Sequence, residues 1–361
     1  MKVKVAFVLV IAISFSALYG QKKPLSVNKR PKNIILMIGD GMGISQVYAG
    51  MLASDNGLNI EKFRYIGFSK TTSADNLVTD SGAAGTAIAA GKKTYNGAIG
   101  VDTDTIPLES ILHYAEKNGL STGLVATSAI THATPAAFIA HQKSRKMYEA
   151  IAADFLKTDI DLFIGGGRAH FENRKDSLNL SDILRQKGYQ VIYDTVELKN
   201  SDSGLIAAML ADSHMPTISE GRGNMLPLSV EVALNNLSSN KKGFFLMVEG
   251  SQIDWACHDT NALYLVGEML DFDIAVGKAL KFAEKDGNTL LIVTADHETG
   301  GVAITGGSIA KGAAEIKFVS TDHTALPVPV FAFGPGAEEF IGFYENTGIF
   351  DKMMKLFGFA K

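Results

Sequence analysis

Short apolar runs alternate with helix-like stretches along this chain, and this alternation restricts its fold more than any other feature. Several of the runs are rich in Ile, Val, Leu and Phe without polar alternation, which is typical of strands buried on both faces of a mainly parallel sheet. The runs span residues 33–38, 123–127, 162–165, 191–194, 244–248, 290–294 and 328–333. The sequence therefore predicts an α/β fold, a three-layer sandwich with a central, mostly parallel sheet flanked by helices.

Three helices are expected between these strands. Residues 81–91 are rich in alanine, residues 108–118 have helical spacing, and residues 262–285 form a long amphipathic stretch. No repeat or proline-rich linker divides the chain, so we expect one catalytic domain over residues 28–361. Within it, residues 168–225 are more polar and less periodic, and we expect loops or a small subdomain there.

The N-terminus has the pattern of a secretory signal peptide over residues 1–20. Lys2 and Lys4 precede an apolar run that is too short for a comfortable membrane span, and small residues follow it. An uncleaved anchor is the alternative reading, and no other segment is apolar enough for a stable membrane span. The single cysteine, Cys257, excludes an internal disulfide, which favours an exported bacterial protein of the periplasm or the extracellular medium.

The overall charge argues against nucleic-acid binding. Asp and Glu number 38 and Lys and Arg number 34, for a net charge of -4, so the chain has no basic footprint. A site for an anionic ligand would need a local source of positive charge.

Polar side chains that can bind metals follow four of the predicted strands. Ligands of open α/β sheets bind at the carboxyl ends of the strands, so these side chains are expected to converge. They are Asp40, His132, Thr134, Glu249, Asp296 and His297.

Glu249, Asp254 and His258 lie within ten residues of one another. Asp254 and His258 are four residues apart, so they share one face of a helical turn and could together bind Zn²⁺. A surface helix with scattered polar residues explains this segment equally well. The adjacent Asp296 and His297 could likewise bind a metal or make simple loop hydrogen bonds.

Ser81 stands at the start of the alanine-rich helix, directly after Asp80. Either residue could merely cap the helix. The same position offers free backbone N–H groups that suit a phosphate, and a bound metal could activate the serine hydroxyl. Arg145 could hold two phosphate oxygens, although a solvated surface charge is the simpler reading of that residue alone.

Six segments together resemble the alkaline phosphatase family, in the family's order and through most of the chain. They read GDGMG, VTDSGAAGTA, THATPAAFIAH, VEGSQIDWACH, TADHETGG and HTALPVPVFAFGPGA. The resemblance implies hydrolysis of phosphate monoesters through a phosphoserine intermediate at two zinc ions and a third metal, usually Mg²⁺.

Carried over residue by residue, the resemblance assigns a role to each site residue. Ser81 is similar to the family's nucleophile, and Arg145 to its phosphate-binding arginine. The implied zinc ligands are Asp254, His258 and His323 at the first site and Asp40, Asp296 and His297 at the second. Asp40, Thr134 and Glu249 correspond to the third site.

Two positions differ from some members of the family. This chain has His132 where some carry Asp, so we count His132 among the metal residues and expect the third site to accept Zn²⁺ or Co²⁺ as well as Mg²⁺. It has Trp255 where some carry Lys, which is expected to weaken the hold on phosphate.

The resemblance also implies a homodimer. Residues 301–322 form a short stretch where many members carry a larger insertion at the dimer interface, so a monomer is the alternative. Rival functions are a phosphodiesterase, sulfatase or phosphomutase of the same superfamily, and a non-catalytic envelope protein with structural metals.

Overall fold

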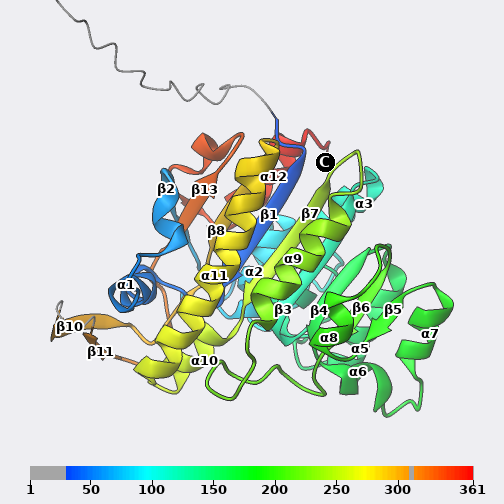
Figure 1. Cartoon of the computed structure of the whole chain (residues 1–361), viewed down its shortest axis with the longest axis horizontal. Helices are drawn as coiled ribbons and strands as arrows, with labels where there is room; N and C mark the ends of the chain where they lie inside the picture. Colours follow the sequence, from blue (N-terminus) through cyan, green and yellow to red (C-terminus); the bar gives the residue numbers. More distant parts are fainter. Residues whose placement is uncertain (1–29, 309–312, 361) are drawn as a thin grey trace, which may run out of the picture.

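A ten-stranded sheet organises the computed structural model, which describes residues 30–308 and 313–360 (Figure 1). The strand order is β14-β2-β13-β8-β1-β7-β3-β4-β6-β5, and every neighbouring pair is parallel except those that involve β13. The predicted α/β fold with a mostly parallel central sheet is confirmed.

The strands of the large sheet are β1 (Asn33–Gly39), β2 (Tyr65–Lys70), β3 (Ser121–Ala129), β4 (Leu162–Gly166), β5 (Gln190–Ile192), β6 (Ile206–Met209), β7 (Phe244–Gly250), β8 (Thr289–Thr294), β13 (Val328–Phe333) and β14 (Gly342–Glu345). Two small antiparallel pairs are β9 (Glu298–Thr299) with β12 (His323–Thr324), and β10 (Ala303–Ser308) with β11 (Ala313–Lys317).

The α-helices are α1 (Ile44–Ala53), α2 (Ser81–Ala90), α3 (Ile111–Lys117), α4 (Ala133–Ala136), α5 (Tyr148–Asp154), α6 (Arg168–Glu172), α7 (Leu180–Gln186), α8 (Thr195–Lys199), α9 (Met225–Leu237), α10 (Gln252–His258), α11 (Ala262–Asp286) and α12 (Thr347–Phe357). Single 3-10 turns are η1 (Asn59–Lys62), η2 (Phe155–Lys157) and η4 (Ala337–Phe340).

Successive residues of the central strands enter two separate cores, one on each face of the sheet. In β1, Ile34, Leu36 and Ile38 pack in one core, while Ile35 and Met37 pack in the other. Helices α2, α3, α5, α7 and α12 cover the first face, and α1, α8, α9, α10 and α11 cover the second (Figure 1). Burial on both faces explains why these strands read as continuous apolar runs.

Two predicted boundaries are wrong, and capping side chains explain both. The strand predicted at 191–194 ends at Ile192, because the Asp194 side chain accepts hydrogen bonds from Val196 N and Glu197 N at the start of α8, both at 2.8 Å. The helix predicted at 108–118 begins at Ile111, because Ser110 Oγ accepts from His113 N at 3.3 Å.

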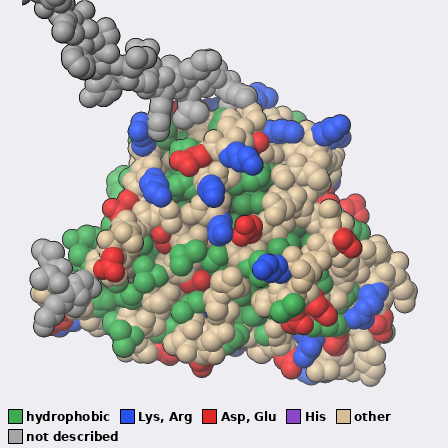
Figure 2. Space-filling model, in the orientation of Figure 1, with side chains coloured by type: hydrophobic (Ala, Val, Ile, Leu, Met, Phe, Trp, Pro, Cys, Tyr) green, Lys and Arg blue, Asp and Glu red, His purple; other side chains and the backbone are tan. Residues whose placement is uncertain are grey.

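Residues 168–225 add regular structure to the edge of the large sheet. They contain α6, α7 and α8 as well as β5 and β6, which pair with each other and, through β6, with β4. The predicted signal peptide, 1–20, lies outside the described residues. Among the residues that are described, no helix is long and apolar enough to cross a membrane. On the face drawn in Figure 2, acidic and basic side chains are interspersed.

Glu116 of α3 should make the stability of the metal-loaded protein depend on pH. Burial raises the pKa of this carboxyl to about 7. A group whose pKa is raised by folding stabilises the protein at low pH, and that contribution is lost as the pH rises through about 7. We therefore expect Glu116→Gln to raise the thermal midpoint at pH 8 by about 2–4 °C, which corresponds to roughly 1 kcal/mol of unfolding free energy. At pH 4 the substitution should change the midpoint little.

Thermal unfolding of the metal-loaded protein between pH 4 and pH 8 measures this effect. Glu284→Gln, at an exposed position of α11, is the matched control and should follow the parent at every pH. A Glu116→Gln curve parallel to that of the parent would refute the assignment.

Candidate active site

The predicted metal residues converge at the carboxyl ends of four adjacent strands. Strands β8, β1, β7 and β3 are neighbours in the sheet. Asp296 and His297 follow β8, Asp40 follows β1, Glu249 is the penultimate residue of β7, and His132 follows β3. Residues up to 257 positions apart in sequence, Asp40 and His297, are thus brought together by the parallel topology.

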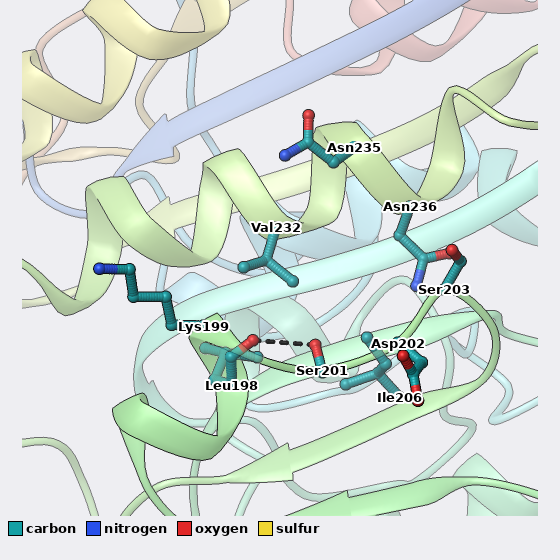
Figure 3. Close-up of a pocket in the computed structure, with 9 residues that line it drawn as sticks. All are labelled: Leu198, Lys199, Ser201, Asp202, Ser203, Ile206, Val232, Asn235 and Asn236. Carbon is teal, nitrogen blue, oxygen red and sulfur yellow. Dashed lines mark hydrogen bonds between the residues drawn. The ribbon is translucent and has the colours of Figure 1, made fainter.

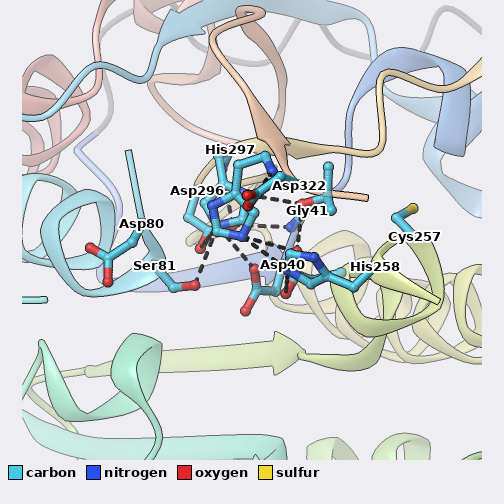
Figure 4. Close-up of polar contacts among 12 residues, drawn as sticks. Asp40, Gly41, Asp80, Ser81, Cys257, His258, Asp296, His297 and Asp322 are labelled. Atoms are coloured by element: carbon cyan, nitrogen blue, oxygen red, sulfur yellow. Dashed lines mark hydrogen bonds and ion pairs between the residues drawn. The ribbon is translucent and has the colours of Figure 1, made fainter. Parts of the chain in front are cut away.

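One cluster consists of Asp40, Asp296 and His297, all with no exposed surface. His297 Nε2 lies 3.4 Å from Asp40 Oδ1 and 3.3 Å from Asp296 Oδ2 (Figure 4). Burial, and then repulsion from Asp296, raises the pKa of Asp40 well above its usual value. Burial likewise raises the pKa of Asp296 to about 6. The cluster therefore holds two carboxylates whose charges need a nearby cation.

A glycine lets the Asp40 loop approach α10. Gly41 has φ +72°, in the left-handed region, and a Cβ there would lie 2.8 Å from Asp254 Cα. Its amide N donates to Asp296 Oδ1 at 3.2 Å, which fixes the neighbouring carboxylate.

A second cluster joins Asp254, His258 and His323. Asp254 and His258 lie one turn apart on α10, with Oδ2 and Nε2 separated by 3.3 Å. His323 Nε2 lies 3.1 Å from His258 Nε2 and 3.5 Å from Asp254 Oδ1. Burial opposes ionisation of Asp254, but the hydrogen bond from His258 and the nearby imidazoles outweigh it and lower its pKa. The same hydrogen bond raises the pKa of His258 to about 9.

Backbone carbonyls fix the orientation of the two partly buried histidines of this cluster. His258 Nδ1 lies 2.6 Å from Thr321 O, and His323 Nδ1 lies 2.9 Å from Thr79 O. Because a carbonyl only accepts, each Nδ1 carries a proton, and each Nε2 is left to bind a cation.

The third cluster contains Asp40, His132 and Glu249, with Thr134 beside it. Burial raises the pKa of Glu249 to about 7. Glu249 Oε2 accepts from Ser251 Oγ at 2.6 Å and from Ser128 Oγ at 3.3 Å. Asp40 thus belongs to two clusters at once, as a carboxylate that bridges two cations would.

Unpaired buried atoms provide a test of whether these residues suit metal ions. Six buried side-chain atoms in the clusters have no hydrogen-bond partner: Asp40 Oδ1 and Oδ2, His132 Nδ1, Thr134 Oγ1, Glu249 Oε1 and Asp296 Oδ2. Buried carboxylates without partners are costly unless a cation compensates them. Carboxylate oxygens and imidazole nitrogens are the ligands that Zn²⁺ accepts, so the residues present fit divalent metal ions.

Ser81 is the first residue of α2 and points toward the cluster of Asp40, Asp296 and His297. Its Oγ lies 3.3 Å from His297 Nε2, and only 1% of the residue is exposed (Figure 4). Asp80, not Ser81, caps the helix, because Asp80 Oδ1 accepts from Ala83 N at 3.0 Å. The Ser81 hydroxyl is therefore not consumed by capping.

Arg145 is held beside Ser81 by two side chains. One guanidinium nitrogen donates to Asp80 Oδ2 at 2.8 Å, and the other donates to His132 Nε2 at 3.1 Å. Burial opposes the charge of Arg145, but Asp80 outweighs it and raises the pKa of the guanidinium. A permanent positive charge thus lies against Asp80, the residue that precedes Ser81, as an anion site on an acidic protein requires.

Other residues around the site were not predicted from the sequence. Asp322 forms a cluster with His258 and His323, and Thr299 Oγ1 donates to Asp254 Oδ1. Their positions next to His323 and within the TADHETGG segment were the available signals. Trp255 is half-buried, and its ring centroid lies 5.8 Å from that of His132. Cys257 is buried and lies apart from the histidines (Figure 4).

A cavity of about 140 Å³ lies elsewhere, between α8, β6 and α9 (Figure 3). Its lining includes Lys199, Asp202 and Asn236 and contains none of the cluster residues. It has no part in the site described above.

Comparison with known proteins gives one consistent result. The sequence model of the alkaline phosphatase family matches residues 31–317. Alkaline phosphatase 4 of Bacillus subtilis is 36% identical, with 94% of this chain and 92% of the relative covered. Alkaline phosphatase of Escherichia coli K12 is 31% identical, with 92% and 87% covered.

Solved structures agree with the sequence relatives. An alkaline phosphatase from the Antarctic bacterium TAB5 superposes with a TM-score of 0.89 and 44% identity, covering 92% of this chain and all of that one. Two mutants of the TAB5 enzyme, in which a histidine is replaced by Asp or by Glu, were solved with Mg bound in the M3 site. Each has a TM-score of 0.87 and 42% identity and covers 92% of this chain and 99% of its own.

Proposed function

The chain belongs to the alkaline phosphatase family and is thus a phosphomonoester hydrolase, and we propose that it acts through a phosphoserine at Ser81 in a centre of two zinc ions and a third metal. The observation that carries this proposal is the position of Ser81 Oγ, 3.3 Å from His297 Nε2 at the edge of three groups of metal-binding side chains. If His297 Nε2 is occupied as a metal ligand, it cannot act as a general base, and Ser81 then depends on the metal to become a nucleophile.

Each cluster would hold one ion. Asp254, His258 and His323 would bind the first zinc, and Asp40, Asp296 and His297 the second. Asp40, Thr134 and Glu249, together with His132, would bind the third ion, Mg²⁺ or, in its place, Zn²⁺ or Co²⁺. Bound metals would lower the pKa of the serine hydroxyl and stabilise the attacking and leaving oxygens.

The protein's own residues position the reacting groups. Helix α2 presents Ser81 Oγ, which would lose its proton to solvent, to the phosphorus atom. An O–P bond forms while the ester O–P bond breaks in line with it, and the departing alkoxide takes a proton from water and leaves as the alcohol. Water then cleaves the phosphoserine, which releases inorganic phosphate and restores Ser81.

Arg145 would bind two oxygens of the phosphoryl group, with Asp80 holding the guanidinium in place at 2.8 Å. Trp255, half-buried beside His132, would contact the substrate without supplying charge. The phosphate would therefore be held by Arg145 and the metals alone.

His132 is expected to make the third site weakly selective. An imidazole is a softer ligand than a carboxylate, so the preference for Mg²⁺ over Zn²⁺ or Co²⁺ should fall. After dialysis against an equimolar mixture of the three ions, elemental analysis should find a mixture at the third site in the parent. His132→Asp should shift that site toward Mg²⁺. Strict retention of Mg²⁺ by the parent would contradict this expectation.

The domain organisation, location, oligomeric state and substrates of the enzyme are proposed from its sequence. We propose a single catalytic domain over residues 28–361, with residues 168–225 as a small subdomain of it. We also propose export to the bacterial periplasm or beyond after removal of residues 1–20. We propose a homodimer, with a monomer as the alternative. Its substrates would be small phosphate monoesters, and it would not bind nucleic acid specifically.

A panel of esters with and without chelator tests the proposed function. Phosphate monoesters should be hydrolysed much faster than phosphodiesters or sulfate esters. Chelation should abolish turnover, and zinc with magnesium should restore it, because activation of Ser81 and stabilisation of the leaving oxygen would depend on the bound metals. Preference for diesters or sulfates would indicate a rival enzyme of the superfamily, and metal binding without turnover of any ester would indicate a binding protein.

A further inference from the structure

Residues 211–222 form an irregular segment between β6 and α9, which we call the 211–222 strap. In Figure 1 it is the green loop that passes below α10 before α9 begins. The strap contains no helix or strand, yet side chains and backbone groups of three other elements fix it at its start, middle and end.

The start of the strap is bound to the turn after β4. Gly167 N and Arg168 N both donate to Ala211 O at 3.0 Å. Gly166 permits this approach, because a Cβ at that position would lie 2.1 Å from Ser213 O. The backbone at 211–213 therefore cannot move away from β4 without losing these bonds.

The middle of the strap is bound by α10, the helix that carries Asp254 and His258. Gln252 has no exposed surface, and its Nε2 donates to Met215 O at 2.8 Å and to Thr127 O at 3.0 Å. Tyr264 OH donates to Gln252 Oε1 at 2.8 Å, so both polar ends of the glutamine side chain are occupied.

The end of the strap is bound by a buried ion cluster on α11. The Arg222 side chain is fully buried and pairs with Glu268 and, at 2.9 Å, with Asp271. It also donates to Pro216 O at 3.1 Å, and Ile218 N donates to Glu268 Oε1 at 3.0 Å. A buried charge cluster of this kind fixes geometry, because removing one member leaves the others uncompensated.

The fixed strap delivers His214 to the third metal cluster. Ala129 N, at the end of β3, donates to His214 Nδ1 at 3.0 Å. The ring of His214 lies edge-on to Trp255 at 4.7 Å and to His132 at 5.5 Å, and His132 lies edge-on to Trp255 at 5.8 Å. The three rings form a triangle in which each restrains the other two.

We propose that His214 is a positioning residue that sets the affinity of the third metal site by holding the rings of Trp255 and His132. This inference rests on the proposed function, since it assumes that His132 and Glu249 hold the third ion. His132 Nε2 also accepts a hydrogen bond from Arg145, so the tilt of the His132 ring controls the position of the phosphate-binding arginine as well. Support of a metal residue by a neighbour commonly changes metal affinity about 10- to 100-fold.

The test uses protein loaded with two equivalents of Zn²⁺ per chain, which leaves the third site for Mg²⁺, and it has two readouts. Equilibrium dialysis against Mg²⁺ with elemental analysis gives the midpoint of third-site loading, and time-resolved fluorescence anisotropy reports the motion of Trp255, the chain's single tryptophan. His214→Ala should raise the Mg²⁺ midpoint by about 10-fold or more and add a fast component to the Trp255 anisotropy decay.

Two further variants separate positioning from a general loss of structure. His214→Asn keeps an acceptor for Ala129 N, and His214→Phe keeps a ring against Trp255, so each should recover part of both readouts. His113→Asn, at a histidine of α3 outside the triangle, should match the parent in both readouts. An unchanged midpoint and unchanged anisotropy in His214→Ala would overturn the proposal.

The anisotropy readout requires no turnover, so it also distinguishes failure of the positioning role of His214 from failure of the proposed function. If the enzyme is active and His214→Ala changes neither readout, only the proposed positioning role of His214 is refuted. A protein inactive on all esters that still shows the Trp255 change refutes the proposed function while the packing role of His214 holds.

Discussion

Ser81→Ala is expected to lower kcat for phosphate monoesters by at least about 10³-fold while leaving the metal content unchanged. The alanine removes the hydroxyl oxygen that lies 3.3 Å from His297 Nε2. None of the unpaired carboxylate or imidazole atoms that suit a metal belongs to Ser81. Steady-state kinetics and elemental analysis on the same preparation measure both effects.

Ser239→Ala provides the matched control. Ser239 is an exposed serine beyond α9 whose Oγ donates to Asn236 O at 2.8 Å, and its removal should leave kcat and metal content unchanged. Turnover by Ser81→Ala at a rate near that of the parent would show that the nucleophile is another group.

Asp40→Asn is expected to have two effects of opposite sign. Turnover should fall by more than about 100-fold, because Asp40 belongs to two clusters. Loss of a residue that only hydrogen-bonds to a metal ligand already lowers metal affinity or activity about 10- to 100-fold. The metal-free variant, however, should be more stable than the metal-free parent by about 1–3 kcal/mol near pH 8.

The gain in stability follows from the burial of an unpaired charge. Both carboxylate oxygens of Asp40 lack a hydrogen-bond partner, and burial together with Asp296, Asp254 and Glu249 raises its pKa. A carboxyl whose pKa is raised by folding stabilises the folded protein at low pH and destabilises it as the pH rises. The stability advantage of the asparagine variant should therefore grow with pH. Thermal unfolding after chelation, at several pH values, measures it.

Asp55→Asn is the control for this experiment. Asp55 is exposed in the turn after α1, and its replacement should change neither the metal content nor the stability of the metal-free protein. A metal-free Asp40→Asn variant less stable than the metal-free parent would contradict the account of the buried carboxylates.

The central strands could be predicted because both of their faces are buried. Strands β1, β7 and β8 are apolar throughout, so burial alone is visible in the sequence. Strands β14 and β2 were missed, because they are the outermost and the second strand at one side of the sheet and keep exposed residues. Strand β6 was missed as well, since its short IAAM sequence has no pattern that distinguishes it from a helix.

The convergence of the metal residues could also be predicted in outline. Asp40, Glu249 and Asp296 follow or end adjacent parallel strands, and the rule for carboxyl ends places them together. Their division into three sets came from the resemblance to a family. Spacing alone left Asp254 and His258 ambiguous between metal binding and a polar surface.

The surroundings of the third cluster could not be predicted from the sequence. His214 reaches it from a segment without periodicity, and it is placed by hydrogen bonds from Gly167, Gln252 and Arg222. Such contacts join parts of the chain that only the folded structure brings together. A histidine in a polar loop is most simply explained by core or surface hydrogen bonding, so the sequence assigns His214 no role.

The stereochemistry of hydrolysis tests the central claim most directly. The measurement uses a phosphate monoester made chiral at phosphorus by oxygen isotopes and determines the configuration after transfer to an acceptor alcohol. Each in-line displacement inverts the phosphorus, so transfer first to Ser81 and then to the acceptor predicts overall retention. Overall inversion would mean a single direct displacement and would contradict a phosphoserine at Ser81.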